Sequence, residues 1–151
     1  MREIKFCGKR KDNGEWIYGN LVILGNKYFI CEKDTSIINT YFEHCFKEVI
    51  PETVGQYTGL KDGTKWEELT KEEQEKWLKS GKTKKEWNGK EIFKDDIIED
   101  EYGNYLIVKW NKIFGCWEFS GVKLSDYGDT DFWFKKVKVI GNIHDNPELL
   151  K

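Results

Sequence analysis

One cluster of side chains in the sequence has the residue types for metal chemistry. Its five carboxylates fall within seven positions, at Asp95, Asp96, Glu99, Asp100 and Glu101. Carboxylates at this density can hold a divalent cation for phosphodiester hydrolysis. Runs of charge more often form a solvated turn and strand face, and we favour that second interpretation.

The pair His144-Asp145 has the residue types of a general base and its orienting partner. Adjacent residues rarely face each other, so a C-terminal turn stabilised by Asn and Asp side chains is the favoured interpretation. No motif places Ser or Cys beside this pair, and nucleophilic catalysis therefore has no support. We predict a protein that is not an enzyme, with no catalytic residue, no cofactor and no metal.

Lysines lie beside aromatic residues in two parts of the chain. One is Lys109-Trp110, and the other contains the candidate binding residues Trp133, Lys135, Lys136 and Lys138. Stacking combined with phosphate contacts is how small barrels bind single-stranded nucleic acid. The alternative is that the aromatic residues are core and the lysines keep strand edges soluble. The net charge is only −2, from 25 Lys and Arg against 27 Asp and Glu, which favours the alternative.

The segment 64–86 is rich in Lys and Glu and predicts a helical region within a β-rich chain. Thr70-Lys-Glu-Glu73 fits a capping box, which predicts a helix over 71–79 that ends near Gly81. The similar spacing of Thr64 and Glu67 predicts a second capping box on a short preceding turn.

Trp66 and Trp77 are the two candidate binding residues of this segment. On one continuous helix, turns of 100° per residue would place them within about 20° of each other. Such a pair can dock on another protein, or it can pack on its own barrel or on a sister subunit. Both interpretations stay open at this point.

The remaining sequence predicts short strands separated by turns. Strands are predicted around residues 4–6, 16–24, 28–31, 92–98, 105–110, 116–119 and 136–140. Turns are predicted at 11–14, 25–26, 58–63, 88–89 and 102–104. The first three strands should form an antiparallel meander, because their connections are short. The segment 34–48 fits a strand pair or a helix, and 120–130 is predicted to be a mobile loop.

The length and the cysteines predict one cytoplasmic domain with a small insertion. A chain of 151 residues is typical of a single domain. Its four cysteines form no C-x-x-C pair, which favours free thiols in a reducing compartment. The N-terminus lacks the apolar region of a signal peptide, and no apolar run is long enough for a membrane span. We therefore predict no membrane partner.

Five strings in the sequence resemble the YopX family, small proteins encoded by phages and prophages of bacteria. They are KFCGKR at 5–10, GEWIYG at 14–19, VGQYTGL at 54–60, GKEIFKDDII at 89–98 and IGNIHDNP at 140–147. The resemblance implies a β-rich fold with an SH3-like barrel and a homo-oligomer. It implies no established activity, so no catalytic residue follows from it.

The chain departs from the pattern of this family at two places. The family commonly joins GLKD directly to NGK, so residues 63–87 resemble an insertion on an intact barrel. Family members often have Gly where this chain has Asp95. If that position needs a positive φ, Asp is one of the less costly alternatives to Gly.

Together these observations predict a mainly β, α+β protein with an SH3-like barrel and a short helical insertion. The predicted parts are an N-terminal meander at 1–62, the insertion at 63–87 and a barrel part at 88–151. We expect a non-enzymatic, oligomeric phage or prophage accessory protein in the host cytoplasm. It would bind an unknown phage or host protein through the insertion and the 120–130 loop. The alternatives are a single-stranded nucleic-acid-binding module and, less favoured, a metal-assisted hydrolase.

Overall fold

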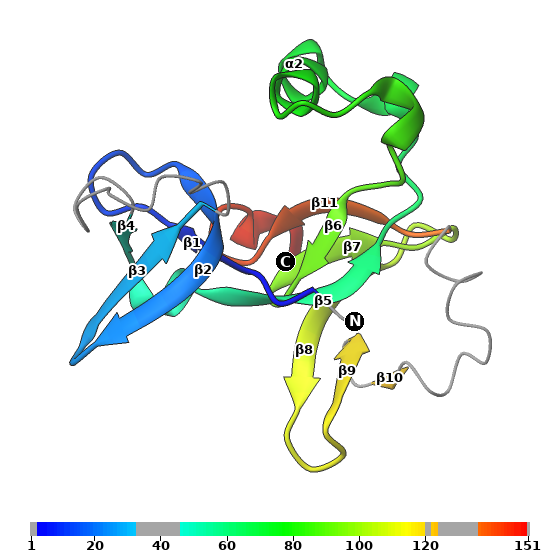
Figure 1. Cartoon of the computed structure of the whole chain (residues 1–151). Coiled ribbons are helices and arrows are strands. Elements are labelled where there is room, and N and C mark those ends of the chain that lie inside the picture. Colours follow the sequence, from blue (N-terminus) through cyan, green and yellow to red (C-terminus); the bar gives the residue numbers. More distant parts are fainter. Residues whose placement is uncertain (1–2, 33–45, 120–121, 124–135, 151) are drawn as a thin grey trace. The chain divides into compact units, whose positions relative to one another are not determined.

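The computed structural model describes residues 3–32, 46–119, 122–123 and 136–150 (Figure 1). These residues form a mainly β fold with one α-helix, as predicted, and the chain forms two compact units, Met1–Gly59 and Leu60–Lys151. Residues 34–45 of the ambiguous segment and most of the predicted loop 120–130 lie outside the described residues.

The first unit is an antiparallel sheet that confirms the predicted meander. Its strands follow the order β4-β3-β2-β1-β5. Their bounds are β1 Phe6–Lys9, β2 Trp16–Leu24, β3 Lys27–Cys31, β4 Phe46–Val49 and β5 Gly55–Lys61, with the 3-10 helix η1 Pro51–Thr53 before β5. The core of this unit contains Ile17, Ile30 and Val49, all buried.

Strand β2 changes partner at its middle. Phe6 of β1 lies opposite Gly19, and Cys31 of β3 lies opposite Asn20. A Cβ atom on Gly19 would stand 1.9 Å from the Cys31 carbonyl oxygen. Glycine is therefore required at this point, because any side chain would collide with the backbone of β3.

Two predicted turns are wrong. Strand β5 continues through the predicted turn at 58–63 and ends at Lys61, with Gly59 at a φ of 88° inside the strand. Asn88-Gly89 forms no tight turn, although Gly89 does have a φ of 103°. A Cβ atom on Gly89 would lie 2.1 Å from the Asp62 carbonyl oxygen, so a close backbone approach explains this glycine.

The second unit contains an antiparallel sheet in the order β10-β9-β8-β7-β11. The strands of this unit are β6 Glu91–Phe93, β7 Asp96–Glu99, β8 Tyr105–Asn111, β9 Cys116–Phe119, β10 Val122–Lys123 and β11 Lys138–Asn142. The last strand begins at Lys138 rather than at the predicted residue 136. Within the part of the chain that the structure describes, this strand order has two ends and is not closed. The SH3-like barrel therefore stays a prediction.

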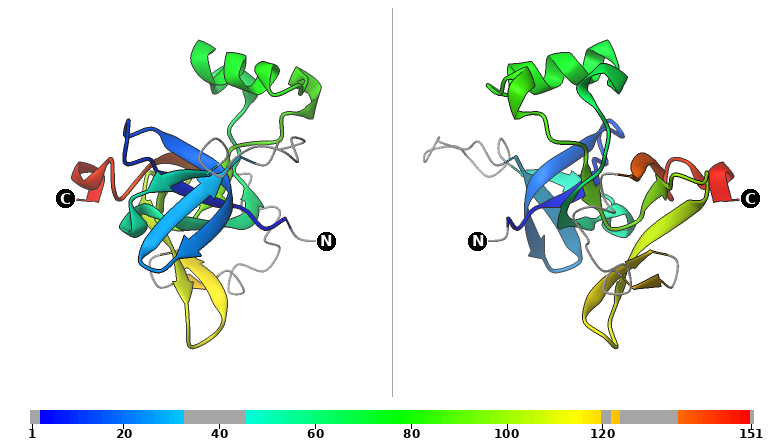
Figure 2. Two further views of the ribbon diagram at one scale, coloured as in Figure 1. Left: turned by 60° about the vertical axis from the view of Figure 1, so that its left-hand side comes forward. Right: turned by 90° about the vertical axis from the view of Figure 1, so that its right-hand side faces the viewer.

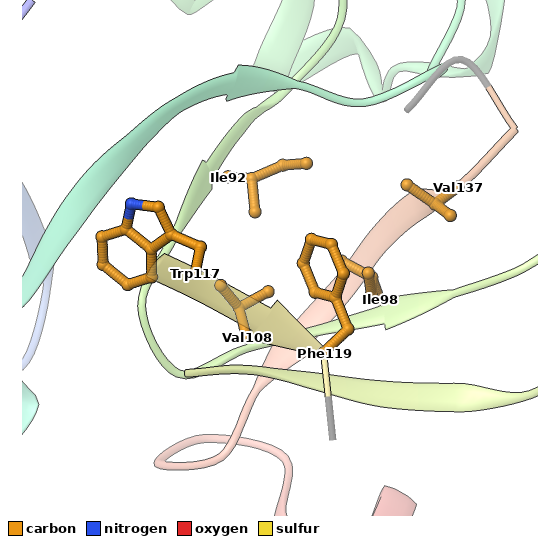
Figure 3. Close-up of a cluster of buried hydrophobic side chains, with 6 residues drawn as sticks. All are labelled: Ile92, Ile98, Val108, Trp117, Phe119 and Val137. Carbon is orange, nitrogen blue, oxygen red and sulfur yellow. The ribbon is translucent and has the colours of Figure 1, made fainter. Parts of the chain in front are cut away.

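The core of the second unit lies on one face of strands β7, β8 and β9 (Figure 3). Its buried residues are Ile92, Ile98, Val108, Trp117, Phe119 and Val137. Alternation along β8 explains this face, because Leu106 and Val108 point inward while Lys109 is exposed. Each large side chain buried here stabilises the fold by about 1.5–3 kcal/mol.

The insertion consists of three short helices that lie outside the strands of the second unit (Figure 2). They are the 3-10 helix η2 Trp66–Glu68, the α-helix α2 Lys71–Lys79 and the 3-10 helix η3 Lys84–Glu86, and η5 Pro147–Leu150 closes the chain. The capping box of Thr70 and Glu73 is confirmed. The predicted box at Thr64 is wrong, because its hydroxyl donates to the Asp62 carboxylate instead.

Candidate functional site

A buried carboxylate joins the base of the insertion to two strands of the second unit. Asp62 is fully buried, and each of its oxygens accepts two hydrogen bonds. The Oδ1 atom accepts from the backbone N–H groups of Thr64 at 2.9 Å and Lys90 at 2.7 Å. The Oδ2 atom accepts from the Thr64 hydroxyl and from the Val139 N–H, both at 2.8 Å. With all these positions occupied, Asp62 is a structural residue rather than a base.

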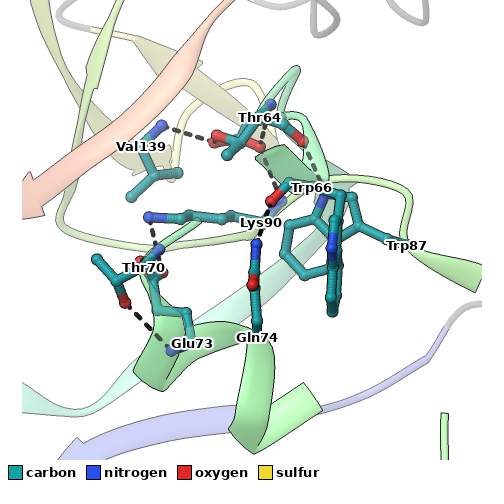
Figure 4. Close-up of polar contacts among 9 residues, drawn as sticks. Thr64, Trp66, Thr70, Glu73, Gln74, Trp87, Lys90 and Val139 are labelled. Carbon is teal, nitrogen blue, oxygen red and sulfur yellow. Dashed lines mark hydrogen bonds and ion pairs between the residues drawn. The ribbon is translucent and has the colours of Figure 1, made fainter. Parts of the chain in front are cut away.

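Trp87 connects the two tryptophans that the sequence singled out (Figure 4 shows Trp66 and Trp87). The Trp66 and Trp87 rings are 6.2 Å apart, and the Trp77 and Trp87 rings are 5.0 Å apart, both edge to face. The Trp87 indole N–H donates to the Thr64 carbonyl at 2.8 Å. Trp66 and Trp77 do not share one continuous helix, because Leu69 and Thr70 separate η2 from α2. The three half-buried rings form one cluster inside the insertion.

Two ion pairs attach the insertion to strands of its own unit. Lys90 Nζ lies 3.0 Å from Glu73 of α2 (Figure 4), and Lys138 Nζ lies 2.5 Å from Glu68 of η2. The Lys138 ammonium donates to the Glu68 carboxylate and holds the pKa of Glu68 below its usual value. The Gln74 side-chain amide also donates to the Trp66 carbonyl at 3.0 Å, which joins α2 to η2.

The predicted nucleic-acid residues are only partly placed by the structure. Trp133 and Lys135 lie outside the described residues. Lys138 pairs with Glu68 as described above, and Lys136 Nζ lies 3.7 Å from Glu101. Each of these two lysines therefore has a carboxylate beside it, which offsets the positive charge that a phosphate would need.

The acidic cluster is divided among different environments. Burial raises the pKa of Asp96 to about 7, and the nearby charges of Asp95 and Asp62 act in the same direction. Burial opposes ionisation of Asp100 as well, but hydrogen bonds from Asn104 and from the Tyr102 N–H outweigh it and lower the pKa of Asp100. Among the described residues, no three His, Cys, Asp or Glu side chains are grouped so as to hold a metal ion.

The structure brings His144 to Asp95 across 49 positions of sequence. The His144 Nε2 atom lies 3.3 Å from Asp95 Oδ2, and both side chains are largely buried. Asp95 has a φ of 72°, in the left-handed region, so the condition under which aspartate was expected to be one of the less costly alternatives to glycine is met. Its N–H donates to the Val108 carbonyl, and its carbonyl accepts from the Ile143 N–H. Hydrogen bonds on both sides therefore hold Asp95 in this conformation.

Two asparagines shape the C-terminal turn that presents His144. The Asn142 Oδ1 atom accepts from the N–H groups of His144 and Asp145, both at 3.0 Å. The Asn146 side chain accepts from the Asn142 N–H at 3.3 Å and fills the space where a Cβ atom of Gly141 would stand. Hydrogen bonds within the string IGNIHDNP therefore stabilise this turn. The contact of His144 with Asp95 attaches it to the corner between β6 and β7.

The sequence did not reveal an exposed apolar surface on hairpin β8–β9. The apex of this hairpin, defined here as residues 112–115, carries Ile113 and Phe114, which are 88% and 59% exposed. Figures 1 and 2 show the hairpin extending away from the other strands of its unit. The signal that could have found it is the adjacent apolar pair inside a loop between two strands.

The family comparison matches the C-terminal part of the chain, which contains the Asp95–His144 contact and hairpin β8–β9. The family model described as YopX protein matches residues 81–151. Residues 81–151 therefore belong to the YopX family. The strings at 89–98 and 140–147 fall inside the matched segment, and they meet in space at Asp95 and His144. The strings at 5–10, 14–19 and 54–60 lie outside it.

Three further findings concern curated relatives, membrane-spanning helices and the cysteines. No curated protein matches this YopX chain. Within the described ranges, no helix combines the length and apolar character needed to cross a membrane. Cys7, Cys31 and Cys116 are free thiols, as predicted for the three cysteines that the structure describes.

Proposed function

We propose that this YopX protein is a non-enzymatic accessory protein of a phage or prophage, which binds another protein and associates with itself. The observation that carries the proposal is the insertion. None of the nine residues of α2 is buried, yet the helix is held by a capping box, a tryptophan cluster and ion pairs. A nine-residue helix is marginal alone in water, so these contacts maintain an element whose surface faces outward.

The titratable side chains support the non-enzymatic part of the proposal. Asp62 and Asp96 accept backbone hydrogen bonds, Asp100 closes the turn after β7, and His144 lies against Asp95. Each of these contacts joins two chain segments or closes a turn. In these positions the carboxylates and the imidazole make contacts within the fold.

Capture experiments with surface variants test the binding role of the insertion. Leu78 of α2 is 51% exposed, and Leu24 at the end of β2 is 55% exposed, which makes Leu24 a matched control. Immobilised wild-type protein should capture a partner from a lysate of infected bacteria. Leu78→Glu should reduce that capture at least about tenfold, and Leu24→Glu should not, as for the centre of an interface.

Equal capture by wild type and Leu78→Glu would reject the insertion as the binding surface. Trp66→Ala and Trp77→Ala are less informative, because both side chains hold the insertion together. Circular dichroism should first show that Leu78→Glu and Leu24→Glu keep the wild-type fold.

Single-stranded nucleic-acid binding is the second candidate function. It has less support because Lys136 and Lys138 both lie beside carboxylates. The proposal for protein binding also predicts a homo-oligomer, which the resemblance to the YopX family implies and which the exposed apex of hairpin β8–β9 supports.

A further inference from the structure

The apex of hairpin β8–β9 is an ordered apolar surface. The Asn111 Oδ1 atom accepts hydrogen bonds from the N–H groups of Ile113 at 2.9 Å and Phe114 at 3.0 Å. The Gly115 N–H donates to the Asn111 carbonyl at 2.9 Å. The backbone that carries the two exposed side chains is therefore fixed before any partner arrives, which reduces the entropic cost of binding.

The opposite end of β8 carries a second ordered surface, the acidic turn, defined here as residues 99–104. The Asp100 carboxylate accepts from the N–H groups of Tyr102 and Asn104 and from the Asn104 side chain. This arrangement leaves Tyr102 81% exposed, and Tyr105 beside it is also exposed. Glu99 and Glu101 flank Asp100, so the turn combines aromatic surface with negative charge.

The two ends of β8 have opposite charge. Lys112 belongs to the apex, and Lys109 precedes it on β8 opposite Glu118 of β9. Glu99 and Glu101 belong to the acidic turn, with Glu99 opposite Lys138 of β11. The ion pair of Glu101 with Lys136 is 3.7 Å long and exposed, so Glu101 can also contact a lysine of a second copy at little energetic cost. A strand of seven residues is about 23 Å long, so the apex of one chain cannot reach its own acidic turn.

We propose that two copies of this chain associate about a twofold axis, with the apex of each hairpin β8–β9 on the acidic turn of the other copy. This inference rests on the self-association in the proposed function and names its surface. A twofold arrangement brings Ile113 and Phe114 of one copy to Tyr102 and Tyr105 of its partner, and the lysines to the glutamates. The contact is self-complementary and closes after two copies.

The amount of apolar surface is consistent with such a dimer. An aromatic side chain buries on the order of 150–250 Å². Tyr102, Tyr105, Ile113 and Phe114 are 81%, 44%, 88% and 59% exposed, so together they can bury on the order of 500 Å². The charged residues around them would supply the rest of the roughly 800 Å² per partner of a standard interface. A nucleic acid fits this surface less well, since two lysines supply little phosphate contact beside so much apolar area.

Sedimentation equilibrium of the full chain tests the surface. The apex variant Ile113→Ser/Phe114→Ser should raise the dimer dissociation constant at least about tenfold, as for the loss of two central apolar anchors. The matched control Ile23→Ser/Leu24→Ser changes two exposed apolar residues at another strand end and should leave the constant unchanged.

A charge exchange tests the pairing itself. Lys112→Glu should weaken the dimer, because each apex would then meet an acidic turn of the same sign. Adding Glu101→Lys to that variant should restore the dissociation constant to within about threefold of wild type, as double-mutant coupling predicts.

The results separate this inference from the proposed function. A wild-type dimer that the apex variant leaves intact, or a charge exchange that fails to restore association, would overturn the twofold contact alone. A wild-type chain that stays monomeric at every concentration would overturn this contact together with self-association. Partner capture by α2 would be unaffected in either case.

Discussion

At the scale of single residues, Asp95 occupies a conformation that most side chains avoid. Its φ is 72°, and its carboxylate contacts His144. A side chain in the left-handed region costs about 1–2 kcal/mol unless a local contact compensates for it. We infer that the His144 contact is what makes aspartate acceptable at a corner whose positive φ would otherwise favour glycine.

Substitutions at Asp95 should separate the backbone from the side chain. Asp95→Ala should lower the free energy of unfolding by about 2 kcal/mol, because it keeps the strain and loses the contact. Asp95→Gly loses the contact but relieves the strain, and should lie within about 1 kcal/mol of wild type. Urea unfolding measures both, and equal losses for Ala and Gly would contradict this explanation.

Asp96 makes the stability of the fold depend on pH. Its pKa in the folded chain is about 7, above the ordinary value of 3.8. A raised carboxyl pKa means that the folded state holds its proton more tightly than the unfolded state. This contribution to stability is present at low pH and is lost as the pH rises from about 4 through 7.

Asp96→Asn should remove that pH dependence. The amide oxygen can still accept the Phe93 N–H that now donates to Asp96 Oδ2 at 2.8 Å. Near pH 8 the variant should be more stable than wild type by about 1–3 kcal/mol, because the side chain is only partly removed from solvent. The difference should shrink toward pH 4 in urea titrations. A difference that stays constant with pH would show that Asp96 does not titrate in this range.

At the scale of secondary-structure elements, the insertion depends on the Trp87 side chain, which contacts both Trp66 and Trp77. Trp87 packs against Trp66 and Trp77, and its indole N–H bonds the Thr64 carbonyl. The capping box of Thr70 contributes only about 1 kcal/mol, which does not hold nine residues in a helix. The order of α2 therefore follows from the tryptophan cluster and its ion pairs.

Trp87→Ala should release α2 without unfolding the sheet. Hydrogen-exchange protection in α2, Lys71–Lys79, should fall at least about tenfold, toward that of an isolated short helix. Protection in β8 and β9 should persist, because the core around Val108 and Phe119 does not include Trp87. Leu78→Ala is the control, since this exposed residue should leave the protection of α2 nearly unchanged. Retained protection in Trp87→Ala would show that the ion pairs suffice.

At the scale of the whole molecule, charge disfavours nucleic acid as the partner. The chain has a net charge of −2, and Lys136 and Lys138 each lie beside a glutamate. Binding to nucleic acid depends on the release of counterions by unpaired cations. The charge distribution therefore favours a partner recognised through apolar and aromatic surface.

Fluorescence anisotropy with single-stranded DNA and RNA checks this expectation. We expect no binding at physiological salt and only weak binding at low salt. Binding that weakens steeply with salt, and that Lys136→Ala/Lys138→Ala abolishes, would make nucleic acid the favoured partner in place of a protein. A control variant at Lys27, an exposed lysine of β3, should leave any such binding unchanged.

Structural features that depend on residues close together in the sequence could be predicted from the sequence alone. The bounds of β2 and α2 and the capping box of Thr70 were all predictable. Alternation, capping and turn chemistry act between neighbours along the chain, so their signals can be read from short strings. The turn predicted at 58–63 is wrong because strand pairing, which depends on distant residues, overrode the local preference of Gly59 for a turn.

Contacts between residues far apart in the sequence became known only from the three-dimensional structure. The Asp62 carboxylate accepts from the Val139 N–H across 77 positions of sequence, and His144 contacts Asp95 across 49. The same holds for the contacts of Trp87 with Trp66 and Trp77, and for the exposure of Ile113 and Phe114 at the apex of hairpin β8–β9. Such contacts depend on loop closure and on which strands pair, and no short pattern in the sequence encodes either of them.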